Sequence, residues 1–366
     1  SSGRLGMMAQ AQLDDPATCD KNLIGTGPFK LKEWKIDDHL TAVKNPDYWN
    51  KDSSGNQLPY LDQITYRPIP DGDARVNALL AGEVNAMHTA GAENIDRLRT
   101  EKDNGKVALV ESDKFAETNY VMLNASKPPF DNINARLAAA YALDRKSFNE
   151  VRNLGLMQVA SGPFAEGSVG YLKDAGFPQY NLDKAKEYSA KYTAETGQPI
   201  EITVLSTPDP STVKSAQFIQ EQVQKAGIKV NLKTVEQAAL ISNALGSDWN
   251  AMAFRNHPGG APDLQYVWWH GGSPVNFGKF NDPEMDKLLD AGRLESDTTK
   301  AASIYEDVNK RFGSQAWNLW LNWTIWDVAS APDVHGVMGP DLPDGSKPFP
   351  GLATGHPVSG MWVSKG

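Results

Sequence analysis

Cysteine is almost absent from the chain, which has a single one, Cys19, among 366 residues. One cysteine cannot close a disulfide within the sequence or supply a metal site built from several thiolates. Apolar runs are short as well, and none approaches the roughly 20 residues that a membrane-spanning helix needs. Residues 1–6 have neither the basic nor the apolar segment of an export signal, so we expect any such signal to have been removed already.

Positive charge is in deficit. The 36 Lys and Arg side chains are outnumbered by 45 Asp and Glu side chains, which gives a formal net charge of -9, and no segment gathers basic residues into one face. Proteins that bind nucleic acid do so largely by neutralising phosphates with Lys and Arg. Nucleic acid is therefore not an expected partner.

The sequence motifs of common enzyme classes are missing. Gly25 and Gly27 lack the third glycine of a dinucleotide-binding turn, and no Gly-Lys-Ser/Thr segment closes a phosphate loop. Gly271-Gly-Ser273 lacks the second flanking glycine of a serine nucleophile elbow. No two of the six histidines stand four residues apart, as they do on a zinc-binding helix. We therefore expect no cofactor, no metal and no catalytic residue, and interpret the protein as a non-enzyme.

The length and the pattern of elements indicate two domains of the α/β class. A single core usually stops growing at roughly 250 to 300 residues, which this chain exceeds. Residues 24–113 predict short strands and helices, whereas residues 119–326 alternate strands with helices, as in a parallel or mixed sheet with covering helices. After Ser330 proline and glycine recur too often for long regular elements.

The clearest unit spans residues 200–254. Strand-like apolar runs at 202–205, 230–232 and 249–254 are separated by two segments with apolar residues at helical spacing. Ser211 is a candidate cap for the first of these helices. The pattern predicts a βαβαβ unit, whose crossovers should be right-handed.

Several short segments, in order along nearly the whole chain, resemble one protein family. The segments are Gly25-Thr-Gly-Pro-Phe29, Asn45-Pro-Asp-Tyr-Trp49, Leu79-Leu-Ala-Gly-Glu-Val-Asn85, Pro128-Pro-Phe130, Arg136, Ala140-Tyr-Ala142, Asp144-Arg145 and Phe280-Asn-Asp-Pro-Glu-Met-Asp-Lys-Leu-Leu289. They are similar to segments of family 5 of the bacterial extracellular solute-binding proteins. These are the dipeptide, oligopeptide and nickel receptors that serve ATP-driven importers.

The resemblance implies a two-lobe, periplasmic-binding-protein-like clamp that encloses a ligand between its lobes. On this mapping residues 1–113 are part of lobe I, residues 114–326 form lobe II, and residues 327–366 return to lobe I. Almost all of the stretch that the family carries before its Gly-Thr-Gly-Pro-Phe segment is missing here. We therefore expect lobe I to be incomplete, by truncation, and to expose apolar surface or strand edges. Cys19 is either a former disulfide partner or a solitary small residue, and we favour the second interpretation.

The implied function is that of the substrate-binding component of an ABC importer. Such a protein captures a small solute, for which the family favours a peptide, and delivers it to a permease in the membrane. We expect it in the periplasm or on the outer face of the cell membrane, lipid-anchored and monomeric when full length. The alternatives are a receptor of the same fold for an oligosaccharide or another small solute, a chaperone-like or signalling receptor, and a two-domain hydrolase.

The segment 255–272 holds the main candidates for ligand contact. It follows a predicted strand, and loops at strand ends of open α/β sheets are common ligand sites. It supplies glycines for close backbone approach, amide and imidazole groups, and aromatic faces. The predicted contacts are Asn256, His257, Gly259, Gly260, Asp263, Trp268, Trp269 and His270 from this loop, with Thr118, Asn119, Tyr120, His88 and Thr89 from the interlobe segments.

Two features of this loop bear on which ligand it binds and on which of its side chains touch that ligand. In the resembled family, peptide receptors often carry an acid here that pairs with the α-amino group of the ligand. Gly259 and Gly260 stand near that place and Asp263 follows, so the anchor is absent or displaced. We expect one of Trp268 and Trp269 in the core and the other at the cleft, because neighbours on a helix point apart.

A tryptophan recurs every third residue near the end of the second domain. This spacing fits neither a helix nor a strand well, and an aromatic platform for sugars is an alternative to packing. We favour packing in the core and between the lobes for Trp317, Trp320, Trp323 and Trp326.

Overall fold

The computed structural model describes residues 8–18, 23–256, 261–339, 341, 345–347, 351–352 and 356–364. The chain forms two compact units. Unit 1 comprises residues 1–89, 94–111 and 327–366, and unit 2 comprises residues 90–93 and 112–326. The chain passes from unit 1 into unit 2 after Glu111 and returns to unit 1 after Trp326. The domain boundaries predicted from the sequence follow residues 113 and 326.

Unit 2 is built on a six-stranded mixed sheet in the order β7-β11-β6-β10-β8-β9. β8, β9 and β10 run parallel, while β6 is antiparallel to both β10 and β11. The α/β class predicted from the sequence is confirmed. The strands are β6 (Thr118–Leu123), β7 (Gln158–Val159), β8 (Glu201–Ser206), β9 (Lys229–Thr234), β10 (Ala251–Asn256) and β11 (Asn318–Trp323).

The predicted βαβαβ unit is present as β8, α7 (Pro210–Gln224), β9, α8 (Gln237–Leu245) and β10. The cap of its first helix differs from the predicted one. The side chain of Asp209, not that of Ser211, accepts the capping hydrogen bond, from the Thr212 amide at 2.9 Å. Pro210 follows this cap as the first residue of the helix, a position where the backbone N–H has no partner within the helix and is not needed.

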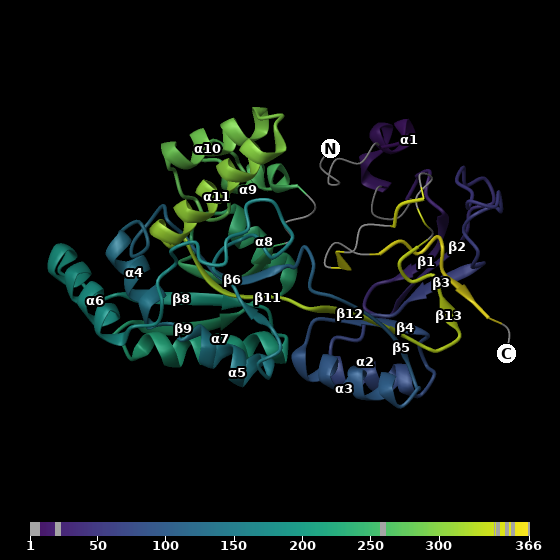
Figure 1. Ribbon diagram of the computed structural model, residues 1–366, viewed down its shortest axis with the longest axis horizontal. Coiled ribbons are helices and arrows are strands. Elements are labelled where there is room, and N and C mark those ends of the chain that lie inside the picture. The colour runs from purple at the N-terminus through teal and green to yellow at the C-terminus, as the bar shows by residue number, and fades with distance from the viewer. Residues whose placement is uncertain are drawn as a thin grey trace. The chain divides into compact units, whose positions relative to one another are not determined.

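Helices cover both faces of this sheet (Figure 1). α5 (Arg145–Asn153) and α7 lie along one face, and α9 (Tyr266–Trp269), α10 (Pro283–Leu294) and α11 (Thr298–Gln315) lie on the other. The core is rich in aromatic rings. Phe312 of α11 packs against Trp320 of β11 with ring centroids 5.4 Å apart. The other elements of this unit are α4 (Ile133–Ala142), α6 (Leu182–Thr196) and the 3-10 turn η2 (Pro262–Gln265).

Two arginines of the family-like segments, Arg136 and Arg145, are buried inside unit 2. Arg136 donates hydrogen bonds to the backbone carbonyls of Phe130, Asp131 and Gln315 at 2.7 to 3.2 Å. Burial lowers the pKa of each guanidinium to about 10, which still leaves both charged at neutral pH. These arginines hold backbone segments together rather than facing a ligand.

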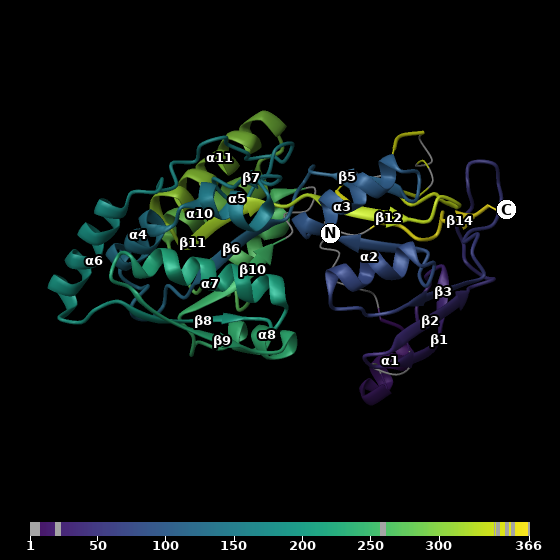
Figure 2. The same cartoon turned by 90° about the horizontal axis from the view of Figure 1, so that it is seen from below.

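Unit 1 contains a three-stranded sheet in the order β4-β12-β5, with α2 and α3 on one of its faces (Figures 1 and 2). Val76 of α2, Leu98 of α3 and Met87 of β4 meet Ala329 of β12 in a small apolar core. The side of β12 that carries Ala329 therefore faces α2 and α3. The bounds are β4 (Ala86–Thr89), β5 (Ala108–Ser112), β12 (Trp326–Ser330), α2 (Gly72–Leu80) and α3 (Ala92–Asp103).

A second sheet of unit 1 is antiparallel, in the order β1-β2-β3. Its strands and the loops beside them expose large apolar side chains, among them Trp34, Ile36 and Trp49. The sequence predicted apolar exposure in this part of the chain. The remaining elements of unit 1 are β1 (Phe29–Lys35), β2 (His39–Lys44), β3 (Gln63–Tyr66), α1 (Gln10–Asp14), the 3-10 turn η1 (Pro16–Thr18), β13 (Val334–His335) and β14 (Trp362–Val363).

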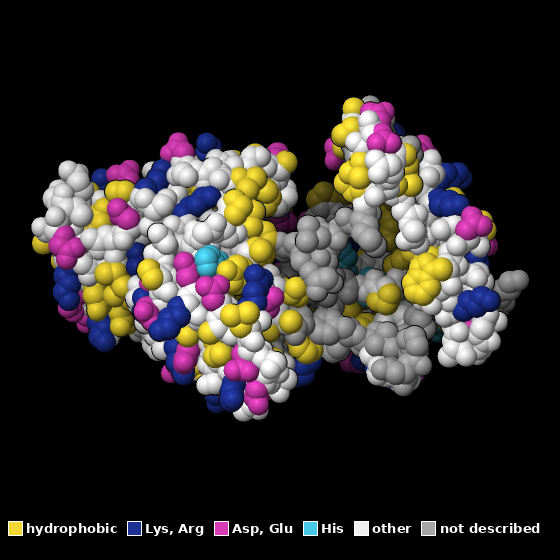
Figure 3. All heavy atoms as spheres, turned by 90° about the horizontal axis from the view of Figure 1, so that it is seen from above, with side chains coloured by type: hydrophobic (Ala, Val, Ile, Leu, Met, Phe, Trp, Pro, Cys, Tyr) yellow, Lys and Arg dark blue, Asp and Glu magenta, His cyan; other side chains and the backbone are white. Residues whose placement is uncertain are grey.

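The surface shown in Figure 3 mixes charges of both signs. Acidic and basic side chains are interspersed over this face, without a large region of a single sign. Among the described helices, none is both long enough and apolar enough to cross a membrane.

Candidate functional site

The end of β10 and the start of β6 lie side by side in the sheet of unit 2. The two strands are antiparallel, with Arg255 opposite Asn119 and Asn256 opposite Thr118. β11 flanks β6 on its other side, and Thr324 directly follows the last residue of β11. The register therefore brings Asn119, Arg255 and Thr324 to one end of the sheet, although they come from distant parts of the sequence.

We call Glu117, Asn119, Arg255, Thr324 and Trp326 the strand-end cluster. Nδ2 of Asn119 donates to Oγ1 of Thr324 at 3.1 Å, and the Thr324 amide donates to the carbonyl of Glu117 at 2.9 Å. Nη1 of Arg255 lies 3.6 Å from Oε1 of Glu117, and the guanidinium lies 6.0 Å from the ring centroid of Trp326. Carboxylate and indole both attract the cation, so the guanidinium is held in place from two sides.

Arg255 and Glu117 differ greatly in exposure. The side chain of Arg255 is 60% exposed and that of Glu117 is 1% exposed. Burying a carboxylate costs free energy unless nearby cations or donors compensate. Arg255 provides a nearby positive charge, and its contacts with Glu117 and Trp326 are longer than hydrogen bonds. The guanidinium carries five N–H donors, and with a side chain that is largely exposed it presents donors to solvent.

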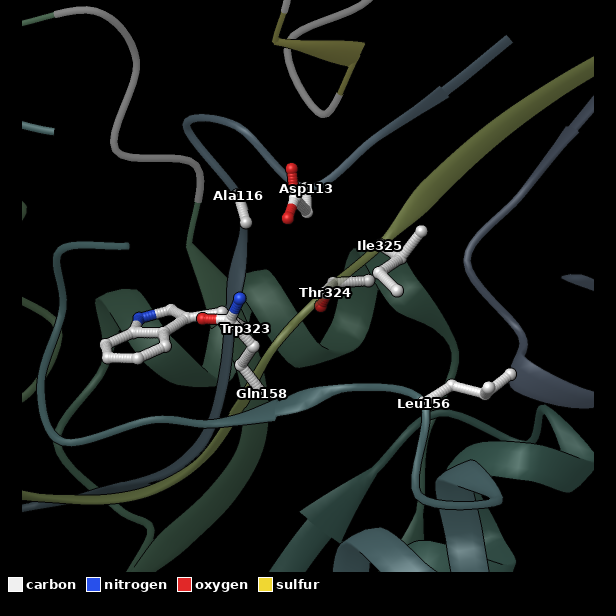
Figure 4. A pocket seen from close by; sticks show the side chains of 7 residues that line it. All are labelled: Asp113, Ala116, Leu156, Gln158, Trp323, Thr324 and Ile325. Atoms are coloured by element: carbon white, nitrogen blue, oxygen red, sulfur yellow. The ribbon is translucent and has the colours of Figure 1, made fainter. Parts of the chain in front are cut away.

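A small cavity of about 90 Å³ shares Thr324 with the strand-end cluster (Figure 4). Asp113 and Ala116 line it from the segment between β5 and β6, and Leu156 and Gln158 line it from the start of β7. The end of β11 and the residues after it, 323–325, complete the wall. A space of this size holds a few water molecules, at roughly 30 Å³ each, or a small part of a ligand.

The structure describes part of the predicted ligand loop. Nδ2 of Asn256 donates to the side-chain oxygen of Gln265. Asp263 forms an ion pair with Arg293, with Oδ1 and Nε 2.7 Å apart. The Asp263 carboxylate thus already has a cation beside it, and a ligand amino group would compete with that arginine. Outside the described residues lie His257, Gly259 and Gly260.

The two neighbouring tryptophans of this loop have different surroundings. Trp269 is 4% exposed, and its ring lies 4.9 Å from that of Phe312, measured between centroids. Trp268 is partly buried, with its ring 4.9 Å from that of Phe277. Of the two indoles that the sequence divided between core and cleft, Trp269 is the core residue. His270, next in the chain, is partly buried.

The predicted contacts of β6 alternate between the faces of the sheet. Thr118 is buried and donates through Oγ1 to the carbonyl of Pro163 at 3.0 Å. The ring of Tyr120 packs 5.0 Å from that of Trp320, and burial raises the pKa of the Tyr120 hydroxyl far above its usual value. Asn119 points to the opposite face, where it joins the strand-end cluster.

His88 and Thr89 belong to β4 of unit 1. Thr89 is buried, and its Oγ1 donates to Oδ1 of Asn94 at 3.3 Å. His88 is exposed on the other face of the strand. Their contact with a ligand stays a prediction.

Sequence reasoning did not include Glu117, Arg255, Thr324 or Trp326 in the ligand site. The sequence gives little indication of their role. Arg255 is merely the first residue of the candidate loop, and Glu117 merely stands two residues before Asn119. Their proximity depends on the pairing of β6 with β10. The described residues contain no group of three His, Cys, Asp or Glu side chains arranged to hold a metal ion.

A sequence profile of the bacterial extracellular solute-binding proteins, family 5 (middle region), matches residues 4–278. The chain belongs to this family. Among curated members similar to it, the oligopeptide-binding protein AppA of Bacillus subtilis is 30% identical over 326 residues, which cover 84% of this chain and 58% of AppA. Heme-binding protein A of Haemophilus influenzae is 27% identical over 330 residues, covering 88% of this chain and 58% of the relative. The family 5 chain thus spans about three fifths of the length of these relatives.

A solved structure of the same fold is that of the ABC transporter-associated periplasmic binding protein DppA from Helicobacter pylori, in complex with the peptide STSA. It superposes with a TM-score of 0.83 at 22% identity, covering 98% of this chain and 68% of DppA. The fold is therefore that of the two-lobe periplasmic binding proteins, as the sequence resemblance implied. The family is one of solute-binding proteins, and its description names no enzymatic activity.

Proposed function

We propose that this protein is the solute-binding component of an ABC importer, which captures a small anionic solute, most simply a peptide, and delivers it to a membrane permease. Family membership and the peptide-binding relatives support this function. The protein acts by binding, and no residue is assigned a catalytic role. Ligand capture in a two-lobe clamp requires that the ligand bind the closed arrangement better than the open one.

The observation that carries the proposal is the presentation of Arg255. Its guanidinium is largely exposed at the end of a central strand, while Glu117 and Trp326 hold it from the protein side. A guanidinium can bind a carboxylate through two parallel hydrogen bonds, which gives orientation as well as affinity. The free carboxylate of a peptide fits this arrangement.

Polar groups beside Arg255 suit the amides of a peptide. Asn119 and Thr324 stand next to Arg255, and an Asn amide group both donates and accepts hydrogen bonds. The cavity of about 90 Å³ beside Thr324 has room for a small side chain or for bridging water. An anchoring role for Asp263 toward a peptide amino group is disfavoured, since Arg293 already pairs with it.

The place of action follows from the same assignment. The protein works in the periplasm or on the outer face of the cell membrane, where a lipid anchor keeps it near its permease, and it acts as a monomer. The family description as extracellular supports this location.

The test is a binding screen with the natural protein. Thermal shift and calorimetric titration with di-, tri- and oligopeptides should identify ligands that raise Tm and bind stoichiometrically. Mass spectrometry of the recovered ligand should show it unchanged. Peptide cleavage at a rate proportional to protein concentration, or exclusive binding of uncharged sugars, would contradict the proposal.

A further inference from the structure

Asp327 is a fully buried carboxyl group at the crossing from unit 2 into unit 1. It follows Trp326 directly and is 0% exposed. In the sheet of unit 1 it stands on β12, opposite Thr89 of β4. Strand alternation places it on the same face as Ala329, which packs against α2 and α3. Neither of its oxygens has a hydrogen-bond partner among the described residues.

The charged groups around Asp327 come from β5 and α3. Glu111 of β5 is the last residue of unit 1 before the other crossing, and β5 is the neighbour of β12 in the sheet. Glu111 accepts two hydrogen bonds from Arg99 of α3, at 2.8 and 2.9 Å. The charge of Lys102 on α3 lowers the pKa of both carboxyl groups, less than Arg99 does, and the charge of Asp96 on α3 raises the pKa of Arg99.

The two carboxyl groups therefore share one close cation, and Glu111 takes both of its hydrogen bonds. On the β4 side the neighbour of Asp327 is Thr89, whose hydroxyl donates to Asn94. Asn94 in turn donates to Asp73 of α2 at 2.8 Å, so the nearest charge along this side is a second acid and not a cation. An ionised Asp327 would be a buried anion that faces the partly exposed Glu111 carboxylate without a donor to stabilise it. A protonated Asp327 would instead present an O–H group for which the Glu111 carboxylate is an acceptor.

We propose that Asp327 and Glu111 form a carboxyl pair that holds one proton at the point where both crossing strands leave unit 1, and that loss of this proton loosens the crossing strands. The proton resides on Asp327. Burial, followed by the nearby Glu111 charge, raises the pKa of Asp327 to about 7. Hydrogen bonds from Arg99 keep the pKa of Glu111 below its usual value, so Glu111 stays ionised.

The direction of the pH effect follows from this pKa. An unfolded Asp titrates near about 3.9, so between roughly pH 4 and pH 7 the folded chain binds a proton that the unfolded chain does not. The stabilisation by this group is full below about pH 4, falls as the pH rises to about 7, and is constant above that. The loss should be local to β5 and β12, whose backbone pairing surrounds the pair.

Hydrogen exchange tests the proposal without any ligand. Protection of the amides in residues 326–330, corrected for intrinsic exchange rates, is expected to fall between about pH 4 and pH 7 in the natural protein and to stay constant from there to pH 8. Asp327→Asn keeps the shape and removes the charge. In this variant the amides of residues 326–330 should exchange at least about tenfold more slowly than in the natural protein at pH 8, and their protection should depend little on pH. Tm at pH 8 should rise by at least roughly 2 °C.

Two further variants separate this account from a general effect of substitution. Asp103→Asn removes an exposed acid from the end of the same helix and should keep the pH dependence of the natural protein. Glu111→Gln removes the neighbouring charge and leaves Arg99 to pair with Asp327, which lowers the folded pKa of Asp327. The loss of protection should therefore be smaller and should be complete at a lower pH than in the natural protein. The proposal is overturned if Asp327→Asn retains the natural pH dependence, or if Glu111→Gln leaves its midpoint unchanged.

Discussion

Nη1 of Arg255 lies 3.6 Å from Oε1 of Glu117, so that an exposed cation stands over a buried carboxylate at the ends of adjacent antiparallel strands. The relationship gives Arg255 two roles. It offsets the charge of Glu117, and it offers hydrogen-bond donors to solvent or ligand. A neutral residue at position 255 would remove both.

Trp269 should contribute to stability far more than Trp268. Trp269→Ala removes a ring that packs against Phe164 and Phe312 and leaves a cavity, so the free energy of unfolding should fall by about 3 to 5 kcal/mol. Trp268→Ala should cost less, because that ring is only partly buried. Urea denaturation of both variants measures the difference. Equal losses would contradict the division of the two residues between core and surface.

Arg136 should be a structural residue rather than a ligand contact. Arg136→Met keeps the length of the side chain but leaves the carbonyls of Phe130, Asp131 and Gln315 without their donor. Buried groups without partners cost about 1 to 3 kcal/mol each, so we expect a loss of about 3 kcal/mol or more. Arg97→Met, at the surface of α3, is the control and should change stability little. Ligand affinity that falls while stability is unchanged would disprove the structural role.

Asp282 should stabilise the protein above acid pH. Its Oδ1 accepts from the Met285 amide at 2.8 Å, which caps α10, and from Nε of Arg311 at 3.0 Å. Burial acts to raise the pKa of Asp282, but the hydrogen bonds from Arg311 and Met285 together hold it below its usual value. This stabilisation is therefore full above about pH 4 and is lost as the pH falls through the folded pKa.

The corresponding measurement is urea denaturation of Asp282→Asn at two pH values. At neutral pH the variant should lose about 1 to 3 kcal/mol, and the difference from the natural protein should shrink below about pH 3. Asp307→Asn, which removes half of an exposed ion pair on α11, should lose less than about 1 kcal/mol at either pH. A loss for Asp282→Asn that is the same at both pH values would show that its charge is not involved.

Local patterns predicted the local structure well. The βαβαβ unit follows from apolar spacing and turn residues. The sequence predicted Ser211 as the cap where the structure has Asp209, and it placed the third strand two residues before β10. The tryptophans at every third residue were ambiguous for a physical reason. A register irregularity between Trp320 and Asn322 pairs Trp320 with Tyr120 and Trp323 with Thr118, so both indoles fall on one face of the sheet.

The strand-end cluster could not be predicted in this way. Asn119 and Arg255 face each other only because β6 pairs antiparallel with β10 in one register, and a shift of one residue would turn either side chain to the other face. No local pattern encodes that register. The resemblance to a family directed attention to the loop after β10, while the cation that the structure presents is the last but one residue of the strand itself.

The most direct test of the proposed function is a thermodynamic cycle on Arg255, measured by calorimetric titration with one peptide ligand bearing either a free C-terminal carboxylate or a C-terminal amide. The natural protein should bind the carboxylate form about tenfold or more tightly than the amide, since each tenfold in Kd corresponds to about 1.4 kcal/mol. Arg255→Gln should lose that preference and bind both forms as weakly as the natural protein binds the amide. Arg67→Gln, an exposed arginine of unit 1, should behave as the natural protein does. If Arg255→Gln keeps the full preference for the carboxylate, Arg255 does not hold the ligand and the assignment of the strand-end cluster is wrong.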